Sequence, residues 1–155
     1  IVGHVSHPHR LPAGEAVVRP GGALQVRVFN RTRGRAEALA AHFGGSVKAC
    51  NWADREKMSA EASVLVNTTS LGLRGEPPLD VDLAGFSTEC VVADIVYVPL
   101  ETQILADARA RGMRTAAGLG MLLHQAVPGF EKWFGVRPEV DRELFDLVSA
   151  DIPKR

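Results

Sequence analysis

The chain has 155 residues, and its 18 Lys and Arg against 18 Asp and Glu give a formal net charge of zero at pH 7. This balance excludes the broad basic field with which proteins attract nucleic acid or an acidic membrane surface. The length predicts one domain with a substantial core, and no apolar stretch approaches the roughly 18 residues that a membrane span needs.

The first 23 residues predict little regular structure. The first three can form the end of a strand, but prolines and a pair of glycines then interrupt any helix longer than about two turns. His4, His7 and His9 suggest a metal site because imidazole is a common ligand. No cysteine or carboxylate stands among them, so we interpret them as loop residues and expect no metal.

From residue 24 onward, short apolar runs alternate with segments of helical period, which is typical of a parallel sheet with crossover helices. The predicted strands cover 24–29, 63–66, 90–96 and, more weakly, 113–117, with 46–49 as a further candidate. Predicted helices cover 36–43, 102–111 and 119–130, and a fourth follows Pro138. The expected fold class is therefore α/β: a Rossmann-like parallel sheet with crossover helices and a helical C-terminus, spanning 24–155.

Ligands of an open parallel sheet bind beyond the carboxyl ends of its strands. Four segments directly follow predicted strands, namely 30–35, 67–72, 97–100 and 118–120. They are rich in hydroxyl, amide, arginine and glycine groups, which suit a phosphorylated cofactor and a polyhydroxy substrate. We therefore expect the site along this edge of the sheet.

The segment after the first of these strands favours NADP over NAD. A strand at this place in a dinucleotide fold usually ends in Asp or Glu, which accepts hydrogen bonds from the ribose 2′-OH of NAD. Here the position holds Asn30, and Arg31 and Arg35 lie one helical turn apart, so that both guanidinium groups can face one phosphate. Thr32 can cap the helix. The alternative is a solvated, basic start of a helix.

The other segments are less specific by themselves. Asn, Thr, Ser and Gly at 67–72 are also what an ordinary turn uses. Tyr97 can equally be a packed tyrosine, and Gln125, two turns into the third helix, can simply be exposed to solvent.

Taken in order and spacing, these motifs resemble the shikimate dehydrogenase family over residues 24 to about 150. Asn30-Arg31-Thr32 with Arg35 is similar to the family's adenosine-phosphate motif, and 67–72 to its Asn-x-Thr-Ser-x-Gly loop beside the cofactor. Residues 94–102 resemble the stretch whose tyrosine touches shikimate, and 118–126 is the most specific match.

The resemblance implies a role for individual residues. NADP is the expected cofactor, and its binding residues are Asn30, Arg31, Thr32, Arg35, Thr68, Ser70, Ile95 and Gly118. Ile95 is expected close to the nicotinamide, and Tyr97 and Gln125 are expected to bind the substrate. In the family a catalytic Lys and Asp pair belongs to an N-terminal domain, so we expect no catalytic residue in this chain.

The implied activity is NADPH-dependent reduction of 3-dehydroshikimate to shikimate, in aromatic amino-acid biosynthesis. Residues 1–155 alone are expected to be inactive. Two alternatives stay open: a non-catalytic nucleotide-binding scaffold or pseudoenzyme, and a quinate/shikimate or aminoshikimate dehydrogenase. The expected partners are a small-molecule substrate and, as a candidate assembly, a homodimer.

One departure from the family concerns the phosphate loop. The family has a Gly-x-Gly-Gly-x-Ala loop about twenty residues before the Asn-Arg-Thr motif, where this chain has Pro8 and Pro12. Prolines lack the N–H groups that a pyrophosphate needs. Two alternatives explain this segment: a truncated or frame-disturbed gene copy, or a true variant of the family.

Cysteine usage and the N-terminus predict a cytoplasmic protein. Cys50 and Cys90 fit no metal spacing and no disulfide framework, so we expect them to be reduced and buried. The N-terminus lacks the basic region and apolar run of a signal peptide.

Overall fold

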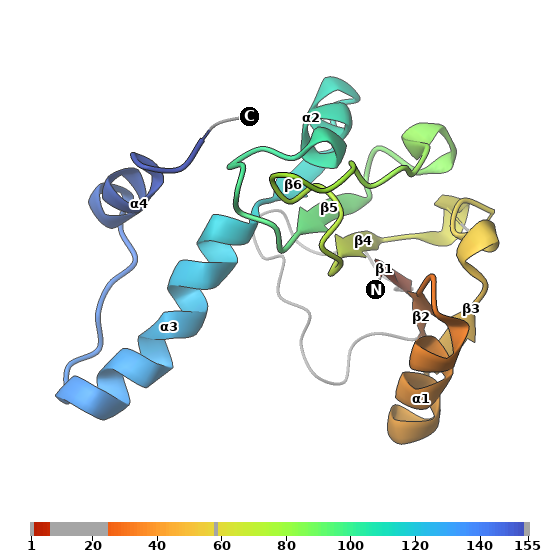
Figure 1. Cartoon of the computed structure of the whole chain (residues 1–155), viewed down its shortest axis with the longest axis horizontal. Helices are drawn as coiled ribbons and strands as arrows, with labels where there is room; N and C mark the ends of the chain where they lie inside the picture. Colours follow the sequence, from red (N-terminus) through yellow and green to blue (C-terminus); the bar gives the residue numbers. More distant parts are fainter. Residues whose placement is uncertain (1, 7–24, 58, 154–155) are drawn as a thin grey trace.

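A computed structural model of the chain describes residues 2–6, 25–57 and 59–153, which form an α/β fold around a six-stranded sheet (Figure 1). The strand order is β3-β2-β1-β4-β5-β6. The strands are β1 Val2–Ser6, β2 Gln25–Phe29, β3 Val47–Cys50, β4 Val64–Asn67, β5 Val91–Asp94 and β6 Arg114–Ala116. The helices are α1 Arg33–Phe43, α2 Gln103–Ala110, α3 Gly118–Phe134 and α4 Arg142–Ser149. The predicted strands and helices after residue 24 are all confirmed.

The pairing of the sheet is parallel except around β1. β2 pairs in parallel with β3, and β4 with β5 and β5 with β6 likewise. β1 lies in the middle and runs antiparallel to both of its neighbours. Since β2 and β4 both oppose β1, they run in the same direction, and the carboxyl ends of all five remaining strands share one edge.

The direction of β1 differs from the all-parallel sheet that the sequence predicts. Val2 pairs with Phe29 and with Asn67 at the carboxyl edge, whereas Ser6 pairs with Gln25 at the opposite edge. The chain therefore leaves β1 and enters β2 at the same edge, which antiparallel neighbours permit without a crossover helix.

Some features singled out in the sequence lie outside the described residues. These are the departure from the family's phosphate loop at Pro8 and Pro12, and the histidines His7 and His9. The expectations for these four residues therefore stay predictions. His4, for which the sequence also predicts a loop, lies instead in β1.

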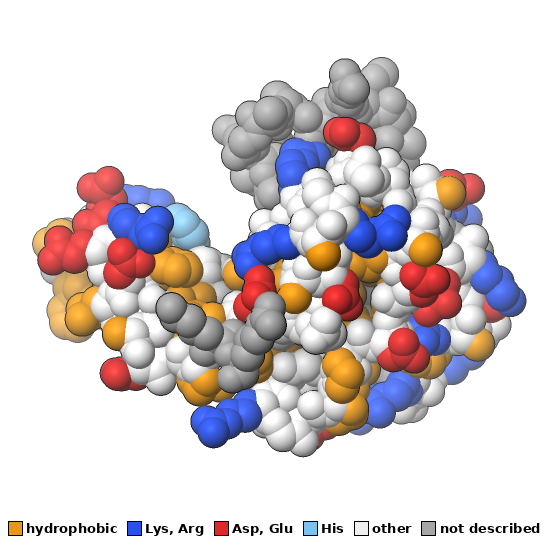
Figure 2. All heavy atoms as spheres, turned by 90° about the horizontal axis from the view of Figure 1, so that it is seen from above, with side chains coloured by type: hydrophobic (Ala, Val, Ile, Leu, Met, Phe, Trp, Pro, Cys, Tyr) orange, Lys and Arg blue, Asp and Glu red, His pale blue; other side chains and the backbone are white. Residues whose placement is uncertain are grey.

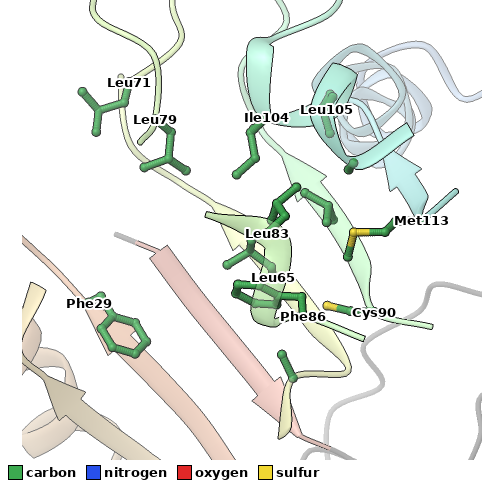
Figure 3. Close-up of a cluster of buried hydrophobic side chains, with 13 residues drawn as sticks. Phe29, Leu65, Leu71, Leu79, Leu83, Phe86, Cys90, Ile104, Leu105 and Met113 are labelled. Carbon is green, nitrogen blue, oxygen red and sulfur yellow. The ribbon is translucent and has the colours of Figure 1, made fainter. Parts of the chain in front are cut away.

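Alternating side chains divide the buried residues of β4 and β5 between the two faces of the sheet. Leu65 and Val92 belong to the main core, while Val64 and Val91 form a second, smaller cluster. The main core also takes up side chains from α2 and from the loop between β4 and β5 (Figure 3). Its members are Phe29, Ala62, Leu65, Leu71, Leu79, Leu83, Phe86, Cys90, Val92, Ile104, Leu105, Ala108 and Met113. This core holds the strand ends that carry the site.

α3 is covered by the rest of the domain only in part. It starts beside β6 and extends away from the sheet, and α4 lies next to it (Figure 1). Leu119 is 1% exposed, but Phe130 is 42% and Trp133 is 80% exposed. The apolar stripe predicted on this helix is thus buried mainly near its start. Figure 2 shows hydrophobic side chains on the surface of this part of the molecule.

Charges of both signs are interspersed over the face in Figure 2, in agreement with the neutral net charge. Within the described ranges, no helix has the length and apolar character that crossing a bilayer would require.

Candidate functional site

A pocket of about 350 Å³ lies at the carboxyl ends of β2, β3 and β4. Its lining comes from the residues that directly follow these strands, because parallel strands bring their carboxyl ends to one edge. The lining residues are Asn30, Arg31, Arg35, Trp52, Thr68, Thr69 and Ser70. The structure therefore brings together five of the sequence-predicted cofactor residues: Asn30, Arg31, Arg35, Thr68 and Ser70.

Two arginines of the pocket are electrostatically uncompensated. Within the described part of the chain, the guanidinium groups of Arg31 and Arg35 have no carboxylate or hydrogen-bond partner. Arg33, between them, pairs with Glu37 at 2.7 Å and donates a hydrogen bond to Asn51. Exposed guanidinium groups that converge on a pocket are suited to bind an anion, phosphate above all.

The turn before α1 sets the direction of these arginines. The Asn30 side-chain oxygen accepts a hydrogen bond from the Thr32 backbone N–H at 2.8 Å. Thr32 occupies the N-cap position of α1, but its side chain makes no capping hydrogen bond, and it does not line the pocket. The predicted capping interaction is therefore absent, since the side chain that closes this turn belongs to Asn30.

The loop after β4 is shaped by the fully buried amide of Asn67. Its oxygen accepts hydrogen bonds from the Thr69 N–H at 3.0 Å and from the Thr69 hydroxyl at 2.8 Å. Its nitrogen donates to the Leu71 carbonyl and to the Asp94 carboxylate, each at 3.0 Å. With every hydrogen-bonding atom of the amide engaged, the loop is held in one shape, with Thr68 and Ser70 exposed along the pocket.

Asp94, at the end of β5, is a carboxylic residue that is only 2% exposed. Its carboxyl group accepts hydrogen bonds from the Val96 N–H at 2.9 Å and from the Thr102 hydroxyl at 2.7 Å, besides the one from Asn67. Burial raises the pKa of the Asp94 carboxyl, against the opposing effect of these hydrogen bonds. Thr102 is the N-cap residue of α2, so the network ties β4, β5 and the start of α2 together.

The remaining predicted residues lie at the end of β5 and on α3, away from the lining of this pocket. Gly118 packs against the turn after β5, and a Cβ atom there would lie 2.4 Å from the Ile95 carbonyl oxygen and 2.6 Å from that of Val96. Tyr97 is 37% exposed, and Gln125 is exposed on α3. The structure thus brings Ile95 and Gly118 into contact.

Sequence reasoning missed Trp52 altogether. It placed Thr69 and Asn67 in the motif at 67–72 and Asp94 and Thr102 in the stretch 94–102, but it did not assign these four residues to the site. A signal for Trp52 was present, because Trp52 closely follows the candidate strand 46–49, which the structure confirms as β3. For Asn67, Asp94 and Thr102 the motifs were the signal, but the sequence does not show that they bond to one another, since Asn67 and Asp94 are 27 positions apart and Asp94 and Thr102 are 8 apart.

No group of three or more potential metal ligands occurs among the residues described here. Both cysteines are free; Cys90 is buried, whereas Cys50 is only partly buried, which corrects the expectation that both are buried. Burial raises the pKa of the Cys90 thiol to about 11, so this thiol is neutral at physiological pH.

Comparison with known proteins gives consistent matches. The family model Shikimate 5′-dehydrogenase C-terminal domain matches residues 118–142. Shikimate dehydrogenase (NADP(+)) of Azorhizobium caulinodans is 59% identical over 131 residues, which are 84% of this chain and 47% of that protein. The chain therefore spans about half the length of this relative.

Solved structures match the fold as well. Quinate dehydrogenase from Corynebacterium glutamicum in complex with NAD has a TM-score of 0.73 and 31% identity, covering 83% of this chain and 47% of that one. Shikimate 5-dehydrogenase from Thermus thermophilus in complex with NADP(H) and shikimate has a TM-score of 0.65 and 34% identity, covering 80% of this chain and 44% of that one.

The crossover helices, the strand order and these structural neighbours define a Rossmann-like domain of the dehydrogenase type. Within this class, the chain belongs to the shikimate dehydrogenase family and corresponds to its C-terminal region.

Proposed function

We propose that this chain is the NADP-binding portion of a shikimate dehydrogenase-like oxidoreductase, which reduces 3-dehydroshikimate to shikimate in aromatic amino-acid biosynthesis. The observation that carries the proposal is the pair of guanidinium groups of Arg31 and Arg35, which have no carboxylate partner among the described residues, at a pocket on the carboxyl edge of the sheet. Its relative from Azorhizobium caulinodans bears the name shikimate dehydrogenase (NADP(+)).

The pocket fits the adenosine 2′-phosphate part of NADP. Its volume of about 350 Å³ is near the lower end of the range of roughly 300 to 1,000 Å³ for ligand sites, which suits half of a dinucleotide. Asn30 brings no negative charge that would repel a 2′-phosphate, and Arg31 and Arg35 can bind it as paired donors. Thr68 and Ser70 add hydroxyl groups from the loop after β4.

Ile95 and Gly118, which lie away from the pocket, are proposed to serve the nicotinamide end of the cofactor. NADPH supplies the hydride when it is bound, and the protein supplies binding and orientation. Gly118 lets the start of α3 pack directly against the backbone at Ile95 and Val96, and we propose that this junction of β5 and α3 holds the nicotinamide end of the cofactor. Thr32 is kept as a further cofactor contact, and Tyr97 and Gln125 as residues that orient the substrate.

Affinity measurements on residues 1–155 test the proposal. Charge-assisted hydrogen bonds contribute roughly 1.5 to 3 kcal/mol each, so Arg31→Ala should weaken NADP about tenfold or more and leave NAD nearly unchanged. Arg111→Ala is the matched control, because it removes the same charge at the end of α2, outside the pocket. Calorimetric titration of all three proteins gives the dissociation constants. Equal losses of NADP and NAD affinity in Arg31→Ala would contradict the assignment.

Two alternatives carry different expectations. A non-catalytic pseudoenzyme that retains the nucleotide-binding fold only as a scaffold predicts a folded chain with little or no NADP affinity. A quinate or aminoshikimate dehydrogenase differs in its substrate, and the solved quinate dehydrogenase in complex with NAD is an observation in favour of keeping this alternative. Because such an enzyme differs only in substrate, cofactor titration does not separate it from the proposed function.

Location and assembly belong to the same proposal. We infer a cytoplasmic protein, which the buried, free thiol of Cys90 supports because such thiols are usual in reducing compartments. A homodimer stays a prediction, and sedimentation of the purified chain over a range of concentrations would test it.

A further inference from the structure

We propose that Trp52 is the nucleobase contact of the pocket, so that the indole binds the purine ring of the ligand whose phosphate meets Arg31 and Arg35. The inference rests on the proposed function and adds to it a residue that the Asn-Arg-Thr motif does not contain. Among the described residues that line this pocket, Trp52 carries the one aromatic side chain.

Trp52 is held by the core on one side. It begins a short 3-10 helix, Trp52–Asp54, two residues after the end of β3. Its side chain is partly buried and packs against the main hydrophobic core, and the residue also lines the pocket. A ring anchored in this way loses little conformational freedom when a ligand binds, which favours affinity.

Arg55 fixes the ring from a second direction. The Arg55 guanidinium carbon lies 5.1 Å from the centroid of the Trp52 ring, within the range of a cation–π contact. Arg55 is itself restrained, since its Nε donates to the Asp80 carbonyl at 2.9 Å and its Nη1 to the Trp52 carbonyl at 3.2 Å. The side chain is only 16% exposed. The indole is therefore positioned before any ligand arrives.

The chemistry of the lining identifies the class of ligand. Arg31 and Arg35 provide anion-binding groups, Trp52 an aromatic surface, and Thr68 and Ser70 hydroxyl groups. An inorganic anion would use only the arginines. A ligand that uses the whole lining combines a phosphate, hydroxyl groups and a flat aromatic ring, as an adenosine phosphate does. Base stacking on an aromatic side chain is worth roughly a tenfold gain in affinity or more.

A fluorescence experiment tests the contact without altering Trp52. The chain has two tryptophans, and Trp133 is 80% exposed on α3, outside the pocket. Trp133→Phe therefore leaves Trp52 as the sole indole. Titration with adenosine 2′,5′-bisphosphate should quench its emission in a saturable way, because a stacked purine quenches indole, whereas inorganic pyrophosphate should change it little. Saturable binding by calorimetry without any change in emission would overturn the proposal.

Variants at position 52 separate this inference from the proposed function. Trp52→Leu should weaken adenosine 2′,5′-bisphosphate about tenfold and leave pyrophosphate unchanged, while Trp52→Phe should restore most of the loss and guards against a general defect in folding. Arg31→Ala should weaken both probes. If Trp52→Leu binds like the unaltered chain while Arg31→Ala does not, Trp52 is no contact and the anion site stands. If the unaltered chain binds neither probe, both proposals fail.

Discussion

At the scale of single residues, the site depends on a contrast between exposed and buried charge. Arg31 and Arg35 are exposed at the pocket, where hydrated guanidinium groups cost little and remain available for an anion. Asp94 is the opposite case: a buried carboxyl whose hydrogen bonds from Asn67, Val96 and Thr102 compensate only part of its lost hydration. It organises the strand ends and is not itself part of the pocket lining.

Replacement of Asp94 should change the way in which the stability of the chain depends on pH. The pKa of Asp94 is higher in the folded chain than in the unfolded chain, so the unfolded chain releases the proton at lower pH. The unaltered chain therefore loses stability as pH rises from about 4 through the raised pKa. Asp94→Asn does not titrate, so its stability relative to the unaltered chain should increase over this window and then level off. Urea denaturation from about pH 4 to neutral pH measures the difference. Parallel pH profiles for the two proteins would refute the assignment of a raised pKa.

Asp94→Ala is the variant to compare with Asp94→Asn. It removes the acceptor of the Thr102 hydroxyl and of the Val96 N–H, and unsatisfied buried groups cost about 1 to 3 kcal/mol each. The alanine variant should therefore be clearly less stable than the asparagine variant at every pH.

At the scale of elements, the site depends on close contact between α3 and the end of β5. Gly118 is required there because any side chain would meet the backbone at Ile95 and Val96. β2, β3 and β4 contribute the pocket in a similar way, each through the residues that closely follow its last paired position. The elements thus act through their ends, and their regular parts hold those ends in place.

Gly118→Ala should separate α3 from β5. Backbone atoms must shift to admit the new methyl group, so the free energy of unfolding should fall by roughly 1 to 3 kcal/mol. Gly120→Ala, two positions on in the same helix, is the matched control, since a Cβ atom there meets nothing within 4 Å. Its better helix propensity should leave stability unchanged or slightly higher. Equal melting temperatures for both variants would show that the close contact is unimportant.

At the scale of the whole molecule, the chain spans about half the length of the relatives it matches. Exposed apolar side chains, among them Trp133, Phe134 and Leu147, lie on α3, which extends away from the sheet, and on α4, which contacts α3 (Figure 1). The pocket brings the arginine pair and the Trp52 ring together within the described residues, whereas the resemblance to shikimate dehydrogenases implies that the Lys and Asp pair for proton transfer lies in an N-terminal domain.

Residues 1–155 alone should therefore not reduce 3-dehydroshikimate. General acid–base catalysis is worth roughly a hundred to ten thousand fold, and positioning of the reactants adds about 7 to 11 kcal/mol. NADPH oxidation, followed by absorbance with 3-dehydroshikimate present, should not exceed the rate without protein, even at concentrations where NADP binds. Steady, substrate-dependent turnover would reveal a catalytic group within this chain.

The sequence by itself determined the elements after residue 24 and the gathering of Asn30, Arg31 and Arg35 at one pocket. Asn30, Arg31 and Arg35 are close in the chain, so a strand end and one helical turn suffice to place them together. The candidate strand 46–49 pointed toward Trp52, but a four-residue strand has a weak pattern, and the residues after it received no weight.

Only the tertiary structure decided the direction of β1, the network around Asp94 and the exposure of α3. An alternating pattern is the same in both directions, so the antiparallel course of β1 depends on its neighbours β2 and β4. The hydrogen bond between Asn67 and Asp94 joins residues 27 positions apart in sequence. The apolar stripe of α3 marks a face that can be buried, and whether it is buried depends on which element lies beside it.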